Sequence, residues 1–322
     1  MKQRIIHVLL LSLLTAGCGQ QDDESVSDTT AALPGYALPD YALTDDTICR
    51  AVFTTYMNRK AVLLGMHHTH FADASGLVAD GSAITAHDAV LLALKAQSLP
   101  PIAVVWGQRR HAMRVGGADA RTDTIGSLDK AVFTERHRLL GCKTGTLAGQ
   151  AGVVLICEGA GGQRYVAAVL GSVREQRWRD ARRLIDLAER RSAHSGSTVS
   201  DRDLRAQGAA VCLLPEVYVP WTKATLPHWL YQRQADMPLL PASVAKTMTA
   251  ICMLDFVDDL DEPFTIVESD IRSGSGPRLK AGDILTYREA LYAMFLPSSN
   301  TAAVAVARCV GRKMLQSGRP HA

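Results

Sequence analysis

Three apolar segments that follow one another closely limit the fold more than any other feature of this chain. They cover Leu139–Thr144, Ala151–Glu158 and Arg164–Leu170, and Ala160-Gly161-Gly162 separates the last two. Short apolar runs separated by glycine-rich turns are typical of antiparallel strands joined by hairpins. A long amphipathic helix, Glu175 to about Arg191, follows directly. This part of the chain therefore predicts a central antiparallel sheet.

Helical patterns lie on both sides of this segment. The predicted helices are Ala51–Leu64, Ala86–Gln97, Ser243–Phe256, Tyr287–Phe295 and Thr301–Val310. Thr85 is expected to cap the second helix, and Pro100-Pro101 to end it. One more strand is predicted at Ala209–Leu214, whereas Ile102–Arg138 is a mixed segment with several glycines and Tyr218–Leu240 is irregular and aromatic-rich. The pattern predicts an α/β (α+β) domain, with helices flanking the antiparallel sheet and a helical subdomain.

The N-terminus carries the pattern of an export signal. Lys2 and Arg4 precede the apolar run Ile5–Leu14, which leads to Thr15-Ala16-Gly17-Cys18. This arrangement is typical of a secretory signal peptide, and the run is too short for a permanent transmembrane helix. The cysteine after Ala-Gly resembles a bacterial lipobox, which implies cleavage before Cys18 and acylation of its thiol. An ordinary signal peptide with an incidental cysteine is the alternative.

These signals divide the chain into three parts. Residues 1–17 are predicted to be a signal peptide and residues 18–46 a flexible tether, because that stretch is polar or poor in hydrophobic periodicity. Residues 47–322 remain for a single folded domain, which is long enough to bury a core. We therefore expect an exported protein that a lipid at Cys18 holds on the membrane, at the periplasmic face of the cell envelope.

Charge and cysteine usage narrow the function classes. The 322 residues carry a formal net charge of +3, with Lys and Arg interspersed among acids. A nucleic-acid binder would show a basic stripe, so no nucleic acid is predicted as a partner. Six of the seven cysteines follow Cys18 and show no CxxC-type spacing. Most are flanked by apolar residues, which favours small buried hydrophobes, and we predict neither a metal nor a cofactor.

The motif Ser243-Val244-Ala245-Lys246 opens a predicted helix directly after Pro241 and Ala242. Residues three apart share a helix face, so Lys246 can reach the Ser243 hydroxyl. A serine hydroxyl is a poor nucleophile at neutral pH, and an amine with a lowered pKa can take its proton. On its own the spacing also occurs on ordinary helices.

Two further motifs supply complementary groups. Ser298-Ser299-Asn300 lies on a turn before a helix, where a hydroxyl and a carboxamide can face a cleft, although a simple helix N-cap is the alternative. Lys143-Thr144-Gly145-Thr146 ends a strand-like run. A cation, a hydroxyl and a glycine on an edge strand suit a peptide carboxylate that binds as an added strand.

Together the three motifs resemble the joint signature of penicillin-binding proteins and class A β-lactamases: S-x-x-K, S-x-N and K-T-G. Surrounding words such as Pro-Ala-Ser-Val-Ala-Lys-Thr-Met-Thr, Thr69-His70-Phe71 and Arg179-Asp180-Ala181 resemble the low-molecular-mass serine-type D-alanyl-D-alanine carboxypeptidases, from about Val52 to about Val310. The resemblance implies a β-lactamase/transpeptidase-like fold. It also implies an enzyme that trims peptidoglycan stem peptides ending in D-Ala-D-Ala and that β-lactams inhibit.

The resemblance implies a role for each motif residue. The catalytic residues would be the acylated nucleophile Ser243, its base Lys246, and the pair Ser298 and Lys143, which relay a proton and set the local field. The substrate-binding residues would be Asn300, Thr144, Gly145 and Thr146, with the two threonines at the terminal carboxylate. The N–H groups of Ser243 and Thr146 would form the oxyanion hole, whose donors typically lower the barrier by a few kcal/mol.

The motifs occur in an unusual order. In the family the chain runs S-x-x-K, S-x-N, K-T-G, whereas here K-T-G comes first. Exchanging the halves between Ser200 and Gly208 would restore the order, which predicts a circular permutation in which Ser192–Ala206 joins the former ends. A misassembled gene is the alternative. Cys49 and Cys309 flank the new break, and a disulfide between them is a further hypothesis.

Two other functions remain open. Class A β-lactamases need a glutamate that activates the deacylating water. The corresponding stretch, Tyr56–Thr134, contains Asp73, Asp80 and Asp88 but no Glu, which favours slow turnover of β-lactams. A non-catalytic lipoprotein that binds cell wall or β-lactams is the second alternative, and the retention of both motif lysines argues against it.

The remaining features favour structural roles. Three histidines on one short loop, His67, His68 and His70, rarely converge on a metal ion. Gly159–Gly162 is predicted to be a hairpin turn. The aromatic residues Trp221, Trp229 and Tyr231 could line a cleft, but core packing is the simpler expectation.

Overall fold

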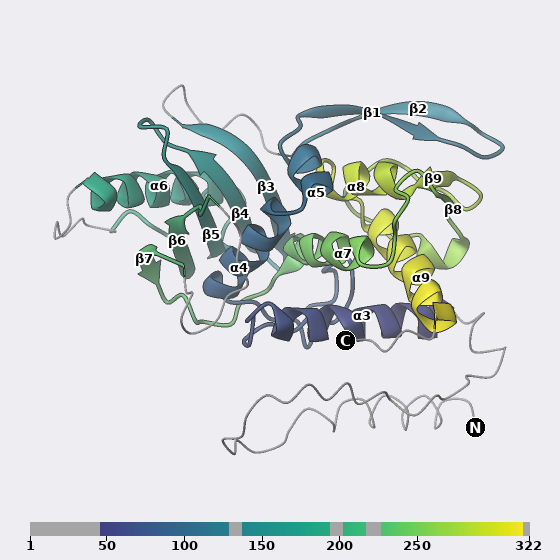
Figure 1. Ribbon diagram of the computed structural model, residues 1–322, viewed down its shortest axis with the longest axis horizontal. Helices are drawn as coiled ribbons and strands as arrows, with labels where there is room; N and C mark the ends of the chain where they lie inside the picture. Colours follow the sequence, from purple (N-terminus) through teal and green to yellow (C-terminus); the bar gives the residue numbers. More distant parts are fainter. Residues whose placement is uncertain (1–45, 129–136, 194–201, 217–226, 318–322) are drawn as a thin grey trace, which may run out of the picture. The chain divides into compact units, whose positions relative to one another are not determined.

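A five-stranded antiparallel sheet occupies the left part of the domain in the view of Figure 1. The computed structural model describes residues 46–128, 137–193, 202–216 and 227–317. The strands of the sheet, in spatial order, are β3 (Arg138–Leu147), β4 (Gln150–Glu158), β5 (Arg164–Ser172), β6 (Gly208–Leu213) and β7 (Trp229–Arg233). All neighbours pair antiparallel, as predicted, and the hairpin turn at Gly159–Gly162 joins β4 to β5. β3 lies at the edge of this sheet.

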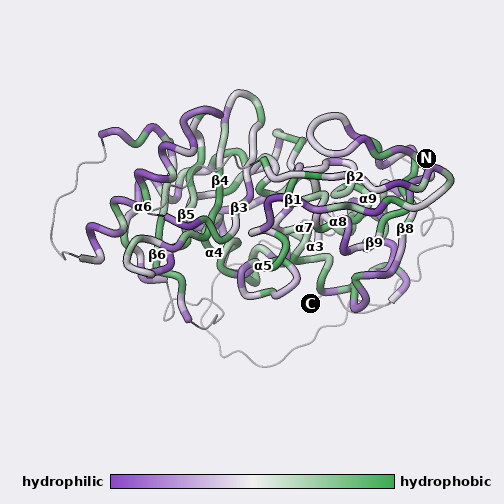
Figure 2. Tube along the Cα trace, turned by 90° about the horizontal axis from the view of Figure 1, so that it is seen from above, coloured by the Kyte–Doolittle hydropathy of each residue, from purple (hydrophilic) through white to green (hydrophobic). Residues whose placement is uncertain are grey.

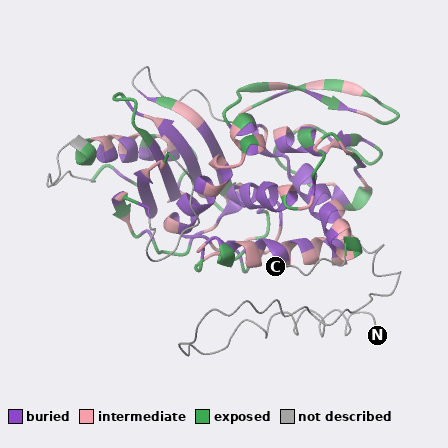
Figure 3. Cartoon of the chain, viewed as in Figure 1, coloured by how far each residue is buried: buried purple, intermediate pink, exposed green. Residues whose placement is uncertain are grey.

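Helices cover both faces of the sheet. Val153 and Leu155 of β4 pack with α6 (Arg177–Ala193), whereas the alternate residues Val154 and Ile156 belong to the core beneath α4 (Ala86–Gln97). Because both faces are buried, the strands read as continuous apolar runs (Figure 3). Most of the trace of α6 is hydrophilic, whereas the strands and α4 are mostly hydrophobic (Figure 2).

A helical region adjoins the α4 face and shares its core. It consists of α3 (Asp46–Leu63), α5 (Pro100–Trp106), α7 (Ala245–Leu254), α8 (Tyr287–Phe295) and α9 (Asn300–Ser317). Nearly all of α7 is buried between α4, α3, α8 and α9. Two small antiparallel sheets cover this region: β1 (Arg110–Val115) with β2 (Arg121–Gly126), and β8 (Pro263–Thr265) with β9 (Ile284–Thr286). A short 3-10 turn, η3 (Glu268–Asp270), lies between β8 and β9 in the chain.

Several elements differ from the sequence predictions. Pro100 does not simply end a helix: it occupies the first turn of α5, where its missing N–H costs nothing. The mixed segment Ile102–Arg138 contains the β1–β2 hairpin, and the segment expected to be irregular contains β7. Asp46, assigned to the tether, is the first residue of α3. By contrast, α4 and α8 have the predicted bounds, and Thr85 accepts the N–H of Asp88 as the predicted cap.

No disulfide links any of the described cysteines, including Cys49 and Cys309. The predicted disulfide is therefore absent from this structure. The backbone of Cys49 packs against Gly311, so closely that a Cβ at that glycine would overlap it. Since Cys309 lies two residues earlier on α9, it is turned roughly 200° around the helix from that contact.

Among the described residues, no single helix is long and apolar enough to cross a membrane. α4 and α5 would reach that length and apolar composition only together, and the chain bends by 105° between them. Several predictions fall outside the described residues. They concern the signal peptide, Cys18, nearly all of the tether, residues 194–201 of the linker Ser192–Ala206, and Trp221. Trp229 and Tyr231 pack against the core, as expected.

Candidate active site

Ser243 lies where an irregular segment enters the buried helix α7. Pro241 leads into a single 3-10 turn, η2 (Ala242–Val244), from which α7 continues. Ala242 has φ of +45°, a left-handed conformation that a non-glycine residue adopts at a cost of roughly 1–3 kcal/mol. One helical turn later, Lys246 places its Nζ 2.8 Å from Ser243 Oγ. The contact predicted from the three-residue spacing is therefore present.

The amine of Lys246 is fully buried and bonded to oxygen atoms. Besides Ser243 Oγ, its Nζ contacts Asn300 Oδ1 at 2.7 Å and the carbonyl oxygen of Ser75 at 2.6 Å. Burial, and then the charge of Lys143, lower the pKa of Lys246 well below its ordinary value. An amine that is readily neutral, beside a serine hydroxyl, is the arrangement that activates a serine nucleophile.

Ser298 and Asn300 lie on the tight turn between α8 and α9. Ser298 has φ of +64°, and Ser299 holds the turn through its N–H, which donates to the Ala293 carbonyl at 2.7 Å. Asn300 begins α9, and its Nδ2 donates to the Ser273 carbonyl at 2.8 Å, which aims Oδ1 at Lys246. Both side chains therefore face the Ser243 region rather than serving as simple helix caps.

Lys143 reaches Ser298 from the edge strand β3. Its Nζ donates to Ser298 Oγ at 2.9 Å and to the Thr144 carbonyl at 3.0 Å. The side chain is 1% exposed. Burial, and secondarily the charge of Arg177, lower the pKa of Lys143 to about 7. Two buried amines, each next to a serine hydroxyl, thus lie close enough for the charge of one to affect the other.

Gly145 permits the close approach between β3 and η2. A Cβ at this position would lie 2.8 Å from the Pro241 carbonyl oxygen and 3.1 Å from the Ser243 nitrogen. On either side of it, Thr144 is buried and Thr146 is exposed. The structure therefore brings the catalytic and binding residues predicted from all three motifs into one place, although they come from distant parts of the chain.

Two family models match this chain, one on each side of the α6–β6 connection. Residues 49–173, which include Lys143, match the D-alanyl-D-alanine carboxypeptidase family. Residues 225–318, which include Ser243 and Ser298, match a β-lactamase enzyme family. The chain belongs to the β-lactamase/transpeptidase-like superfamily. Within that superfamily the first match supports a hydrolase of the serine D-alanyl-D-alanine carboxypeptidase type. Comparison with curated proteins and with solved structures gave no match.

Arg177 is one site residue of this superfamily member that the sequence analysis did not single out. It is the first residue of α6, and its Nη1 donates to the Gly145 carbonyl at 3.0 Å and to Thr146 Oγ1 at 2.9 Å. The guanidinium thus holds the end of β3 and adds positive charge where a substrate carboxylate is expected. Arg177 lies two residues before the motif Arg179-Asp180-Ala181, and this proximity could have identified it as a site residue.

Two glycine-containing turns around the site were given no role from the sequence. Gly76 has φ of +75°, and its missing Cβ makes room for the Ala242 carbonyl. Gly274 and Gly276 lie in an exposed turn over the second motif, and a Cβ on either would crowd Asn300 or Ser299. The turns support the nucleophile and the asparagine from outside the motifs, so spacing alone could not reveal them.

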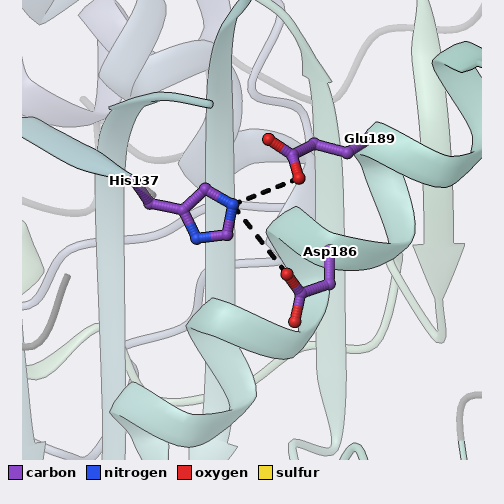
Figure 4. Close-up of side chains that lie close together, drawn as sticks. All are labelled: His137, Asp186 and Glu189. Carbon is purple, nitrogen blue, oxygen red and sulfur yellow. Dashed lines mark ion pairs between the residues drawn. The ribbon is translucent and has the colours of Figure 1, made fainter. Parts of the chain in front are cut away.

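A second group of ionisable side chains lies at the far end of β3, on the α6 side of the sheet (Figure 4). Nε2 of His137 is 3.2 Å from Glu189 Oε2 and 3.8 Å from Asp186 Oδ1. Of the described residues, these three have ligand atoms spaced closely enough for one metal ion. The adjoining cavity is also lined by arginines of α6: Arg179, Arg182 and Arg183. Their charge opposes a cation, so we interpret the group as an ion-pair cluster that fastens β3 to α6.

Two of the three histidines of the early loop, His68 and His70, make contacts that hold the loop in place. The His68 N–H and the Thr69 hydroxyl both donate to the buried carboxylate of Asp88, at 3.0 and 2.7 Å. His70 Nδ1 lies 2.5 Å from the Gly81 carbonyl oxygen. These contacts fold the loop back onto α4.

Proposed function

We propose that this protein removes the terminal D-alanine from peptidoglycan stem peptides ending in D-Ala-D-Ala, through an acyl-enzyme at Ser243. The carrying observation is the pair of buried amine–hydroxyl contacts, Lys246–Ser243 and Lys143–Ser298, next to the edge strand β3. A stable fold gains little from two uncompensated buried lysines, whereas proton transfer at a serine needs such amines.

The substrate is expected to lie along β3. An edge strand offers unpaired backbone groups to an extended peptide, and Gly145 keeps the strand close to Ser243. The terminal carboxylate would meet Thr144 and Thr146, in the positive field of Arg177. This placement puts the carbonyl of the penultimate D-alanine next to the Ser243 hydroxyl.

In the acylation step, neutral Lys246 takes the proton of Ser243 Oγ, and the oxygen attacks that carbonyl carbon. The N–H groups of Ser243 and Thr146 would stabilise the oxyanion, at roughly 3 kcal/mol for each donor. As the C–N bond breaks, Ser298 passes its proton to the leaving amine, protonated Lys143 replaces it, and the proton that Lys246 took returns to Lys143. D-alanine departs, and water then hydrolyses the ester, so that Ser243 regains its proton.

Two measurements on the purified protein test this proposal. A penicillin should add its mass to one residue, Ser243, and Ser243→Ala should abolish the adduct. The wild type should release D-alanine from a pentapeptide ending in D-Ala-D-Ala, whereas the same peptide ending in L-Ala-L-Ala should stay intact. Binding of penicillin or peptide without adduct or release would instead identify a non-catalytic binder.

A β-lactamase is the second candidate, because residues 225–318 match a β-lactamase family. The choice depends on deacylation, which in class A enzymes requires a glutamate absent from Tyr56–Thr134. We therefore expect the penicilloyl adduct to persist for many minutes. Multiple turnovers of penicillin per second would favour the β-lactamase.

We further propose that the enzyme is exported and anchored by a lipid on Cys18, at the periplasmic face of the cell envelope. The support is the sequence pattern alone: a basic start, a short apolar run and Ala-Gly-Cys. Labelling with a radioactive fatty acid should mark the wild type and spare Cys18→Ser. Equal labelling of both proteins, or of neither, would contradict the anchor.

A further inference from the structure

One carboxylate organises the turn that touches the amine of Lys246. Asp73 Oδ1 accepts the N–H groups of Gly76 at 3.0 Å and Val78 at 3.2 Å. Its Oδ2 accepts the N–H of Ser75 at 3.0 Å and also the Ser75 hydroxyl. Four donors occupy the roughly four lone-pair sites of a carboxylate. Asp73 is therefore committed to the turn and is not free to act as a base toward water.

The same turn is fastened to α7 at a second point. Thr249, one turn beyond Lys246 on that helix, donates its hydroxyl to the Ala74 carbonyl at 2.6 Å. The Ala74 carbonyl and the Ser75 carbonyl are consecutive, so α7 holds this piece of backbone through Thr249 and Lys246 together. Both anchors are buried.

The geometry around Lys246 depends on this turn. A neutral amine has two N–H groups and one lone pair. The Ser75 carbonyl and Asn300 Oδ1 are acceptors only, so each must take an N–H. The lone pair is then left for the third neighbour, the Ser243 hydroxyl. Without the Ser75 carbonyl the amine could rotate, and the lone pair would no longer be held toward the serine.

We propose that Asp73 is a positioning residue for the reaction: by folding the turn it fixes the Ser75 carbonyl, which orients the lone pair of Lys246 at Ser243. The inference rests on the proposed function, because it assigns Asp73 a part in acylation at that serine. It goes beyond the three motifs, since Asp73 contacts neither the nucleophile nor the place of the substrate.

Asp73 also acts through its charge. Of the described residues, the charged groups that affect Lys246 are Lys143 on β3, which lowers its pKa, and Asp73, which raises it. Ser75, Asn300 and Ser243 face the amine without charge. Removing the carboxylate therefore has two separable effects: a looser turn slows acylation at every pH, and a lower pKa of Lys246 makes the amine neutral at lower pH.

The test is the acylation rate with a chromogenic cephalosporin, measured from pH 5 to 10 for the wild type, Asp73→Asn and Asp80→Asn. The asparagine keeps one oxygen for Gly76 and Val78 but faces the Ser75 N–H with a donor. We expect the plateau rate to fall roughly tenfold to a hundredfold, and the acidic limb to move to lower pH. Asp80 is an exposed acid of the same loop, so its variant should follow the wild type.

Thr249→Val supplies a second measurement that does not change the charge. It removes the bond to Ala74 with an isosteric side chain, so the plateau should fall while the acidic limb stays in place. A folded Asp73→Asn protein with the plateau and limb of the wild type would overturn the inference. Should Asp73→Asn not fold, Thr249→Val decides: a lowered plateau supports it and an unchanged one overturns it. A wild type that is never acylated at Ser243 would instead refute the proposed function.

Discussion

Replacing Lys143 by methionine should stabilise the folded protein at neutral pH while it abolishes acylation. Lys143 is 1% exposed, and its ammonium donates to two neutral oxygens, Ser298 Oγ and the Thr144 carbonyl. No carboxylate of the described residues forms an ion pair with it. Folding therefore removes this ammonium from water with little compensation, which accounts for a pKa lowered from 10.5 to about 7.

The lowered pKa fixes the direction and the size of the effect. Between pH 7 and pH 10.5 the unfolded chain holds a proton on Lys143 that the folded protein has lost. The unfolded state binds more protons in this window, so the free energy of unfolding rises with pH across it and levels off outside it. At about 1.4 kcal/mol per pKa unit, the penalty at pH 7 is roughly 4 kcal/mol, and roughly half of it disappears by pH 9.

Methionine is similar in length and apolar, so the variant removes the penalty. It also gives up two hydrogen bonds, each with a net contribution of about 1 kcal/mol. Lys143→Met should therefore exceed the wild type in unfolding free energy at pH 7 by roughly 2 kcal/mol, and this advantage should vanish by pH 9. In the variant, loss of the Lys143 charge also lets the pKa of Lys246 rise toward its ordinary value. This change further weakens the pH dependence of the variant's unfolding free energy and so adds to its difference from the wild type.

Urea unfolding at pH 7 and pH 9 measures both quantities. The wild type should gain roughly 2 kcal/mol more than the variant between the two pH values. Lys280→Met, at an exposed lysine, is the control and should keep the pH response of the wild type. If wild type and Lys143→Met changed in parallel with pH, the pKa of Lys143 would not be lowered, and this amine would not be poised to exchange a proton with Ser298 near neutral pH.

Two further substitutions probe the surroundings of the nucleophile. Gly76→Ala should prevent folding or displace η2, since its Cβ would overlap the Ala242 carbonyl. Gly81→Ala is the control, because Gly81 has the same φ of +75° and open space around it, so thermal melts should show a loss of only about 1 kcal/mol. Equal losses of stability in the two variants would refute the contact between Gly76 and Ala242. Arg177→Ala should lower kcat/KM for the peptide roughly tenfold to a hundredfold, because the end of β3 loses two bonds from a charged donor, whereas the exposed Arg179→Ala should change it little.

Local sequence predicted the elements whose signals are strong and local. The strands β3, β4 and β5 are apolar runs separated by turns, and α4 has a threonine cap and an apolar interior, so their bounds followed closely. β1 and β2 carry charged residues on an exposed ribbon that rests on α8, and β7 is a five-residue strand defined by pairing with β6. These three depend on tertiary partners, which no local pattern displays.

The contacts of the active site likewise include some that the sequence predicted and some that it could not. Motif spacing anticipated the Lys246–Ser243 contact, since one helix supplies both residues, and the family resemblance implied that Lys143 and Ser298 meet. Arg177 and Asp73 could not be found by spacing, because each acts through the backbone of another segment. Buried polar contacts of this kind become visible only when the chain is folded.

The order of the motifs leads to a last prediction, that the fold does not depend on where this chain begins. The two ends of the described domain lie together: Asp46, at the start of α3, pairs with Arg312 near the end of α9 at 2.9 Å. A short glycine-rich linker could therefore join Ser317 to Asp46. New termini would fall between α6 and β6, so the rearranged chain would run from Gly208 through the linker to Ala193.

If the present order arose by circular permutation, this rearranged chain restores S-x-x-K, S-x-N, K-T-G and should fold to the same site. We expect the penicilloyl adduct on the same serine and an unfolding free energy close to that of the parent, because loop closure changes with linker length only slowly, by about 0.6 kcal/mol per doubling. The control has the same linker but its new termini within β4, where they interrupt a strand buried on both faces. A rearranged chain that is as unstable as this control would show that the fold depends on its present ends, contrary to the permutation hypothesis.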